Sequence, residues 1–214
     1  PDPTFFYRPD WSPDGKYIAF TDTDFTLWYA DVQSGALKKV DAESFAHVVR
    51  TMNPVWSPDS KWLAYSKLLN SQFKAIFAYN IATGQKIQVT DGIADAIDPV
   101  WDADGRYLYF LASTDFALNS AWLDMSKYNL PVTRGLYMAV LSKTGQSPFL
   151  PKSDEEETKP ASGDNAKKDS VVVKIDADGI QQRILPVNVP VRQYVALMPG
   201  PKDYVFYAES VPNQ

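Results

Sequence analysis

The sequence predicts an all-β fold made of repeated small antiparallel sheets, and three observations support that prediction. A tryptophan-containing motif recurs at Trp11, Trp56 and Trp101, at intervals of 45 residues. Aromatic residues make up 14% of the 214 residues, and 16 prolines outnumber 10 glycines, a composition typical of short strands joined by turns. The first two repeats contain no long amphipathic helical pattern, which argues against alternating strands and helices.

The recurring motif encodes a strand, a tight turn and a second strand. Its copies read DWSPDGKYIAF at 10–20, VWSPDSKWLAY at 55–65 and VWDADGRYLYF at 100–110, with a degenerate fourth copy at 197–207. In the first copy Pro13 suits position i+1 of a type I turn and Gly15 suits position i+3. A strand-like run rich in aromatic and aliphatic residues follows the turn, as at 17–20, so each copy predicts a hairpin.

A second hairpin is predicted in each of the first two repeats. Strand-like runs at 27–31 and 76–80 lead into turns that end at Gly35 and Gly84, and a further strand-like run follows each turn. Four short strands in about 45 residues are typical of a β-propeller blade. We therefore predict a partial propeller of about three to four blades, forming one segment over 1–214. The expected blade units are 8–45, 46–96 and 97–150.

The third repeat is longer than the others because of an insertion at 113–134, in which 120–125 is expected to form a helical turn. Residues 152–170 include an acidic run and have no apolar periodicity, which predicts a disordered linker. After it, Asp178-Gly179 lies between two strand-like runs and predicts an outer hairpin over 171–186. This hairpin either completes the third blade or belongs to another, and a further blade begins over 193–209.

Composition and charge exclude several classes of function. The formal net charge of −5 and the lack of a basic cluster larger than a lysine pair such as Lys167-Lys168 disfavour nucleic acid as a partner. The chain has no cysteine and one histidine, so thiol chemistry and multi-histidine metal sites are excluded, and we expect no cofactor and no metal. No apolar stretch approaches the roughly 20 residues of a membrane-spanning helix. Because the first residue is Pro1, we expect a processed protein or a piece of a longer one.

Several segments resemble the propeller repeats of known families. The opening FYRPDWSPDGK at 6–16 is similar to TolB-like and tricorn-like propellers. Further segments narrow the resemblance to the propeller region of tricorn-type serine peptidases: LWYAD at 27–31, WSPDSKWLAYSK at 56–67, SPF at 147–149 before SDEE at 153–156, and VKIDADGIQQRI at 173–184. The resemblance covers nearly the whole chain.

The resemblance implies a propeller that precedes a PDZ-like module and a catalytic domain with a serine nucleophile and a histidine. Nothing in this chain matches that domain, so we expect no catalytic residue here, although the parent protein would be a serine peptidase, a hydrolase. The implied role is a scaffold and gate for peptides or unfolded polypeptide. The alternative is a TolB-like protein- or peptide-binding module with no protease attached. A third class of function is an enzyme whose active site lies on the propeller itself, but no motif in the sequence supports it.

The expected partners follow from the number of blades. Propellers usually close with four to eight blades, and an open array exposes unpaired strand edges. We therefore expect the missing blades either in the remainder of a longer chain, with its PDZ-like and protease domains, or in other copies of this chain in a homo-oligomer. Many relatives with this repeat work outside the cytoplasm, which implies a periplasmic or extracytoplasmic location, with the cytoplasm as the alternative.

Four residues are candidate peptide contacts. Arg8, Arg50 and Arg134 precede strands at blade entrances or re-entries. Innermost propeller strands line a central channel, where guanidinium groups can bind the carboxylates of a peptide. The alternative for these arginines is ordinary surface ion pairing. Trp122 lies in the insertion, where the repeat does not explain it, and is expected either to cap the core or to face a partner.

Other conspicuous side chains are interpreted as structural. The indoles of the three motif copies are expected in the core between blades, and the turn aspartates are expected to bond the local backbone. His47 lacks an accompanying Gly-x-Ser-x-Gly elbow, so it is expected to be structural or on the surface. Asp22 and Asp24 lack the ligand spacing of a calcium-binding loop.

Overall fold

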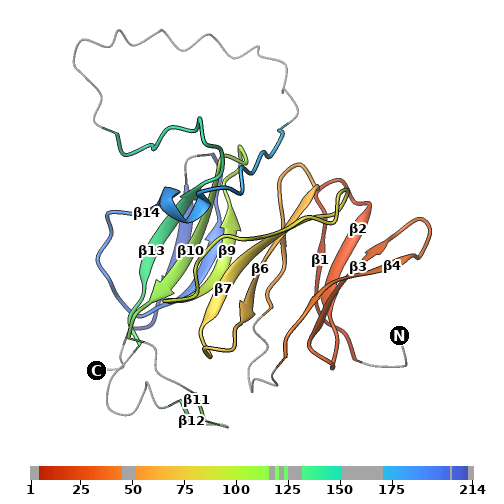
Figure 1. The fold of residues 1–214 in the computed structure, drawn as a ribbon, viewed down its shortest axis with the longest axis horizontal. Coiled ribbons are helices and arrows are strands. Elements are labelled where there is room, and N and C mark those ends of the chain that lie inside the picture. Colours follow the sequence, from red (N-terminus) through yellow and green to blue (C-terminus); the bar gives the residue numbers. More distant parts are fainter. Residues whose placement is uncertain are drawn as a thin grey trace, which may run out of the picture.

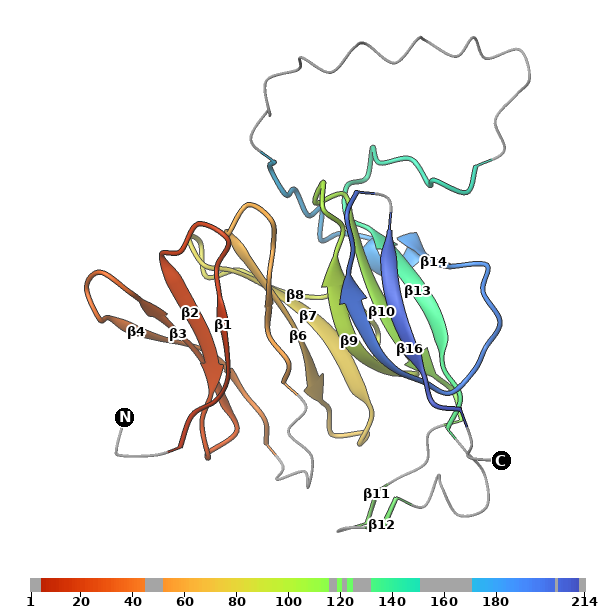
Figure 2. The same ribbon diagram turned by 180° about the vertical axis from the view of Figure 1, so that it is seen from behind.

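The computed structural model describes residues 5–44, 52–115, 119–120, 123–124, 132–150, 171–202 and 204–211. These residues include three four-stranded antiparallel sheets and one two-stranded sheet that stand side by side as the blades of a partial β-propeller, and a second, shorter two-stranded sheet lies within the third repeat (Figures 1 and 2). The first sheet contains β1 (Tyr7–Trp11), β2 (Tyr17–Thr21), β3 (Thr26–Asp31) and β4 (Leu37–Ala42). The second contains β5 (Val55–Trp56), β6 (Trp62–Leu68), β7 (Lys74–Asn80) and β8 (Lys86–Gln88). The third contains β9 (Asp95–Trp101), β10 (Tyr107–Ser113), β13 (Gly135–Val140) and β14 (Ile184–Pro186).

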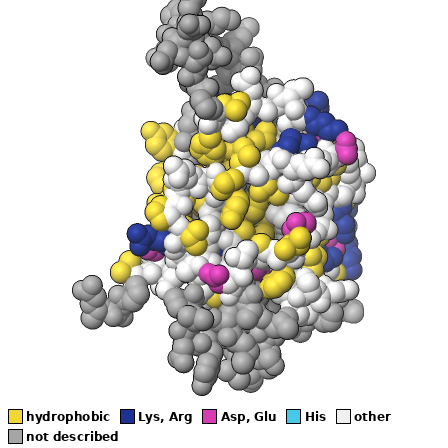
Figure 3. All heavy atoms as spheres, turned by 60° about the vertical axis from the view of Figure 1, so that its left-hand side comes forward, with side chains coloured by type: hydrophobic (Ala, Val, Ile, Leu, Met, Phe, Trp, Pro, Cys, Tyr) yellow, Lys and Arg dark blue, Asp and Glu magenta, His cyan; other side chains and the backbone are white. Residues whose placement is uncertain are grey.

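The fourth sheet is a hairpin of β15 (Tyr194–Pro199) and β16 (Val205–Glu209). Each of these four sheets keeps its strands in sequence order, so the chain completes one of them before it starts the next. The all-β prediction and the four-stranded blade are therefore confirmed. Hydrophobic side chains spread across the side of the molecule formed by the last two sheets (Figure 3). The exposed apolar residues of β15 and β16 include Val195, Phe206 and Tyr207.

The turns between the first two strands of each blade have the structure that their sequence predicts. Ser12 Oγ donates to Asp14 Oδ1 at 2.7 Å and accepts from the main-chain N–H of Tyr17 at 2.9 Å. Ser57 and Asp59 repeat the same bond at 2.6 Å. Because the polar side chains satisfy main-chain groups within the turn, its geometry is fixed locally.

The motif tryptophans connect each blade to the one before it. Trp56 and Trp101 are 7% and 6% exposed. The Trp56 indole N–H donates to the Asp10 carbonyl at 3.0 Å, and the Trp101 indole N–H donates to the Val55 carbonyl at 3.1 Å. The expectation that Trp11 is also buried is wrong, because its side chain is 56% exposed. In the described part of the chain no sheet precedes β1 to cover this indole.

Apolar clusters fill the spaces between neighbouring sheets. The cluster between the first two sheets includes Leu27, Tyr29 and Leu63, and the cluster between the second and third includes Ile76, Leu108 and Phe110. The contacts of each sheet are therefore mainly with its immediate neighbours, as in other repeat architectures.

A buried carboxylate joins the outer parts of the first two sheets. Asp41, in β4, is 7% exposed. It accepts from the Tyr65 hydroxyl at 2.9 Å, and it pairs with the ammonium groups of Lys67 at 2.7 Å and Lys86 at 3.0 Å. Tyr65 and Lys67 come from β6 and Lys86 from β8, so a single side chain of the first blade connects two strands of the second.

The hairpin predicted over 171–186 is not formed. Residues 171–177 are extended without strand pairing, 180–183 form a 3₁₀ turn, and β14 pairs with β13 as the outermost strand of the third sheet. Val173 and Ile180 are buried in the core between the second and third sheets. The main-chain N–H of Val173 donates to Asp59 Oδ2 at 2.9 Å. The burial of Val173 and Ile180 against two blades outweighs the tendency of Asp178-Gly179 to bring its flanking segments together as a paired hairpin.

Most of the predicted insertion and all of the predicted linker at 152–170 lie outside the described residues. Within the insertion, β11 (Asn119–Ser120) pairs antiparallel with β12 (Leu123–Asp124), which replaces the expected helical turn by a short hairpin.

Gly105 provides a test of how closely the segment at 171–175 packs on the turn of the third blade. It has φ +67°, and a Cβ atom at this position would lie 2.5 Å from Val173 Cγ2. We expect Gly105→Ser to lower the free energy of unfolding by about 2–4 kcal/mol, from the combined effects of left-handed backbone strain and overpacking. Urea denaturation measures this loss.

The matched control is Gly15→Ser at the same position of the first blade. Gly15 has φ +70°, but a Cβ atom added there would meet nothing within 4 Å. The substitution is therefore expected to lower the free energy of unfolding by only about 1 kcal/mol, the effect of a left-handed backbone without overpacking. Equal losses in the two variants would show that the extended segment does not pack on Gly105 in solution.

Candidate functional site

A cavity of about 610 Å³ lies where the innermost strands of the four sheets come together. Its wall includes residues of β1, β9 and β15 and the segment that enters β5. Ser66 and Lys74, from the second sheet, contribute further polar groups. Since the innermost strands of a propeller bound its central channel, this cavity is the described part of that channel.

The repeat places a polar side chain in this cavity three times. Arg8, Asn53 and Asp98 each stand directly before a proline and three residues before the motif tryptophan, and all three line the cavity. Arg8 and Asp98 have left-handed backbones, with φ of 51° and 52°. The pairing of β1 with β2 and of β9 with β10 shifts register at these points, so each is a bulge that turns the strand.

Internal hydrogen bonds engage both carboxylates in the cavity. Asp98 Oδ1 accepts from the Asn53 side-chain amide at 3.1 Å. Burial raises the pKa of Asp10 above its usual value, and a hydrogen bond from the main-chain N–H of Trp56 opposes that rise. Arg8 is exposed and forms no ion pair with any other residue that the structure describes.

The predicted contact residue Arg134 is part of an internal ion pair. Its guanidinium lies 3.5 Å from Asp95 Oδ2, and its side chain is 14% exposed while that of Asp95 is fully buried. Asp95 Oδ1 also accepts from the main-chain N–H of Lys74 at 3.0 Å. These contacts give Arg134 a structural role between the second and third sheets. Its assignment as a peptide contact stays a prediction.

Of the other predicted contact residues, Arg8 alone lies in the part of the chain that the structure describes. Arg8 lines the cavity. Arg50, Trp122 and His47 lie outside the described residues. The sequence interpretation did not include Asn53 and Asp98 among the candidates, although they occupy the same position before a proline as Arg8.

The turn aspartates are structural, as expected for Asp14 and Asp59. Asp104, in the third blade, instead forms ion pairs with Arg106 at 3.2 Å and with Lys202 of the fourth blade at 3.1 Å. Beside it, burial raises the pKa of Asp102 above its usual value, and the nearby Arg106 opposes that rise.

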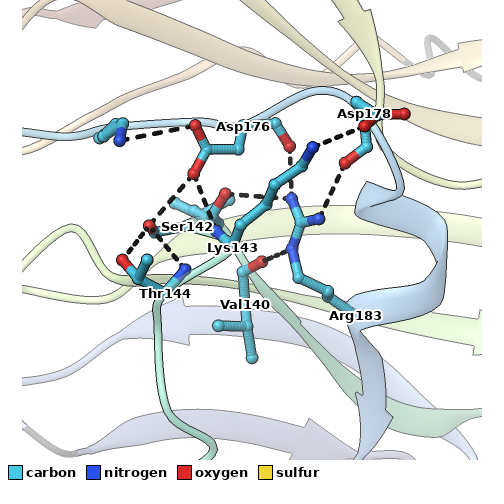
Figure 4. Close-up of polar contacts among 9 residues, drawn as sticks. Val140, Ser142, Lys143, Thr144, Asp176, Asp178 and Arg183 are labelled. Carbon is cyan, nitrogen blue, oxygen red and sulfur yellow. Dashed lines mark hydrogen bonds and ion pairs between the residues drawn. The ribbon is translucent and has the colours of Figure 1, made fainter.

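A second cavity, of about 750 Å³, lies at the outer end of the third blade around Arg183. The Arg183 guanidinium donates to the carbonyls of Val140 at 3.0 Å and Asp178 at 2.9 Å, and also to those of Leu141 and Asp176 (Figure 4). Lys143 pairs with Asp178 at 2.5 Å. Because the guanidinium donors are directed at main-chain carbonyls, this arrangement clamps 176–183 onto the end of β13 and is a structural feature.

The described residues offer neither a metal centre nor a membrane-spanning helix. Among them, no three acidic or histidine side chains are grouped so that they could hold a metal ion. No helix in this part of the chain is long and apolar enough to cross a membrane.

Comparison with known proteins relates this geometry to a family. The family model described as the tricorn protease second beta propeller domain matches residues 2–213. A tricorn-like protease C-terminal subunit from Sulfurisphaera tokodaii is 29% identical over 91% of this chain and 21% of its own length. A tricorn protease homolog from Saccharolobus solfataricus is 25% identical over 91% of this chain and 17% of its own length.

A solved structure supports the same fold. The crystal structure of the tricorn protease superposes with a TM-score of 0.66 and 16% identity, over 91% of this chain and 18% of that one. The chain thus spans about a fifth of the length of the curated relatives it matches. Since the family model covers almost every residue, the resemblance inferred from the repeats is confirmed, and the chain belongs to the family of tricorn protease second β-propeller domains.

Proposed function

We propose that this chain is a non-catalytic propeller section of a tricorn-like serine peptidase, where it serves as a scaffold and as a gate for peptides. The observation that carries the proposal is the cavity of about 610 Å³ bounded by the innermost strands of all four sheets. A passage walled by strands from several blades has a width set by the rigid fold, so it can select polypeptides by their size and extension.

The lining of the cavity suits weak and sequence-tolerant contact with a peptide. It combines apolar side chains such as Ile97 and Leu197 with the charged groups of Arg8 and Lys74. A gate must release what it admits, which favours such a mixture over a deep apolar pocket or a dense cluster of one charge.

The buried serines of the described turns support a role without chemistry. Ser12 and Ser57 each donate to a turn aspartate and accept from a main-chain N–H. A serine nucleophile instead needs a general base within hydrogen-bond reach and an orienting acid. These hydroxyl groups are therefore used to fix the turns.

The exposed faces of the array are the proposed docking surfaces for the rest of a longer polypeptide, with PDZ-like and protease domains, or for other copies of the chain. A location outside the cytoplasm stays a prediction.

A blocking substitution in the intact parental peptidase tests the gate. Val195 lines the cavity and is 56% exposed, so Val195→Trp narrows the passage without disturbing the core. We expect kcat/KM for an unfolded protein substrate to fall by about tenfold, which corresponds to about 1.4 kcal/mol, while turnover of a tripeptide amide changes much less. Steady-state kinetics with both substrates measures the difference.

The matched control is Val172→Trp, because Val172 is 64% exposed and does not line the cavity. It should leave both substrates unaffected. Equal loss of both substrates in Val195→Trp, or no loss of either, would overturn the gate. Reproducible peptide cleavage by the isolated chain that a substitution within it abolishes would overturn its non-catalytic assignment.

A further inference from the structure

Three neighbouring innermost strands keep a common frame, in which the residue before the proline differs in every blade. The frame reads Arg8-Pro9-Asp10-Trp11 in the first blade, Asn53-Pro54-Val55-Trp56 in the second and Asp98-Pro99-Val100-Trp101 in the third. Proline and tryptophan stay fixed at the 45-residue interval, while the residue before proline changes from a cation to an amide to an anion. All three variable residues line the same cavity. This pattern is expected where a constant scaffold presents side chains of different chemistry to a ligand.

The backbone at this position is strained in two of the three blades. Arg8 and Asp98 have φ of 51° and 52°, although neither is glycine and each precedes a proline. The left-handed region is unfavourable for such residues, and conformations of this kind concentrate at binding sites, where the surrounding fold enforces them. The strain recurs at one repeat position and directs two variable residues to one cavity, so it supports a binding role.

The hydrogen bonds in the cavity determine which groups are available to a ligand. A carboxylate only accepts hydrogen bonds, so the bond of 3.1 Å from Asn53 to Asp98 orients the Asn53 amide with its nitrogen toward Asp98. The other end of that amide, Asn53 Oδ1, is buried and has no hydrogen-bond partner among the described residues. A buried acceptor without a partner is costly, and a donor from a ligand would satisfy it.

The charges point to an anionic group on the ligand. Both cavity carboxylates already have protein donors, Asp98 from Asn53 and Asp10 from the main-chain N–H of Trp56. Arg8, in contrast, is exposed and has no ion-pair partner in the described part of the chain. Its planar guanidinium suits bidentate binding of a carboxylate.

We propose that Arg8, Asn53 and Asp98 form a recognition site for a carboxylate-bearing extended peptide. Arg8 binds the carboxylate, Asn53 Oδ1 accepts a main-chain N–H of the peptide, and Asp98 is a positioning residue that holds the Asn53 amide in the required orientation. The carboxylate belongs either to an acidic side chain or to the C-terminus of the peptide. This inference rests on the proposed function and specifies the class of peptide that the gate contacts.

Fluorescence anisotropy of the 214-residue chain with three labelled octapeptides tests the site. All three are built from alanine and glycine; the first has a free C-terminus, the second an amidated C-terminus and one internal glutamate, and the third an amidated C-terminus and no acidic group. We expect the first or second to bind more tightly than the third. Binding of the first alone identifies a chain end as the ligand, and binding of the second alone identifies an acidic side chain.

Two substitutions assign the contacts. Arg8→Gln should weaken binding of the carboxylate peptides by about tenfold, the usual effect of losing a charge-assisted hydrogen bond, and leave the neutral peptide unchanged. Lys39→Gln is the matched control, since it removes one positive charge from an exposed position on β4 away from the cavity. Asn53→Ala should weaken binding severalfold for every peptide that binds, because it removes a main-chain contact.

Equal binding of all three peptides, no binding at millimolar concentration, or equal effects of Arg8→Gln and Lys39→Gln would overturn the inference. Thermal unfolding of each variant checks that the fold is retained. If no peptide binds but Val195→Trp still slows turnover of unfolded protein, only the recognition site fails. If peptides bind as expected and Val195→Trp has no effect, only the gate fails.

Discussion

Replacing Trp101 by alanine is expected to lower the free energy of unfolding by about 3–5 kcal/mol, the usual range for truncating a buried tryptophan. Trp101 is 6% exposed in the cluster between the second and third sheets, and its indole N–H donates to the Val55 carbonyl. The substitution therefore leaves a cavity and a main-chain acceptor without its donor. Urea denaturation followed by circular dichroism measures the loss.

Trp11→Ala is the internal control, since the same residue at the same repeat position is 56% exposed. We expect its effect on the isolated chain to stay within about 0.5 kcal/mol, as for other surface substitutions. Trp101→Phe retains most of the apolar surface but lacks the indole N–H donor. Its loss of stability, compared with that of Trp101→Ala, therefore separates the effect of packing from that of the hydrogen bond. Similar losses for Trp11→Ala and Trp101→Ala would contradict the arrangement of the sheets.

Removal of the Asp41 carboxylate has the second large expected effect. Asp41→Ala leaves the ammonium groups of Lys67 and Lys86 without their anion, and the Tyr65 hydroxyl without its acceptor. Breaking a buried ion pair from one side typically costs about 3–5 kcal/mol. We expect a loss at the lower end, about 3 kcal/mol, because the Lys86 side chain is 41% exposed and can be hydrated. Chemical denaturation at pH 7 measures it.

The same carboxylate should also contribute to acid sensitivity. Burial opposes its ionisation, but the hydrogen bonds from Lys67, Lys86 and Tyr65 outweigh burial and hold the pKa of Asp41 below its usual value. A lowered folded-state pKa stabilises the fold above the unfolded value of about 3.9, and this contribution is lost as pH falls through the folded value. Asp41→Asn should therefore flatten the fall in stability below about pH 4. If stability fell just as steeply with decreasing pH in Asp41→Asn as in the unmodified chain, the Asp41 carboxylate would not be held as the anion.

The repeated turns were predictable from sequence because their structure is decided within a few residues. Ser12 and Asp14 satisfy the turn from inside, and the copy at Ser57 and Asp59 does the same. The burial of an indole depends instead on a neighbouring sheet. Trp11 and Trp56 both begin the sequence Trp-Ser-Pro-Asp, but only Trp56 has a preceding sheet against which it is buried.

The error over 171–186 has a different physical cause. Asp178-Gly179 does form a tight left-handed turn, with Gly179 at φ +68°. The segment before it is held by the core through Val173 and by the Arg183 clamp, and it does not pair with the strand that follows. Contacts with residues more than 100 positions away, such as Val173 to Asp59, are not visible in a local pattern.

The candidate site was only partly predictable. Arg8 was identified because an arginine at a channel entrance suggests an anion. Asn53 and Asp98 were missed because they share with Arg8 a position before proline and not a residue type. The signal was present in the repeat itself, where a changing residue stands directly before a fixed proline and three residues before a fixed tryptophan. The meeting of the three residues in one cavity depends on the spacing of the sheets, which local sequence does not encode.

The Arg183 clamp makes the third blade permissive to changes in chain length. The chain leaves the strands of this blade after β13 and returns to them at β14, and the clamp together with the β13–β14 pairing fixes the point of return. The entropic cost of closing a connection grows only with the logarithm of its length, about 0.6 kcal/mol per doubling. An affinity tag or a surface anchor inserted between Leu150 and Val171 is accordingly expected to leave the clamp and the β13–β14 pairing in place, so that the domain can be immobilised through it.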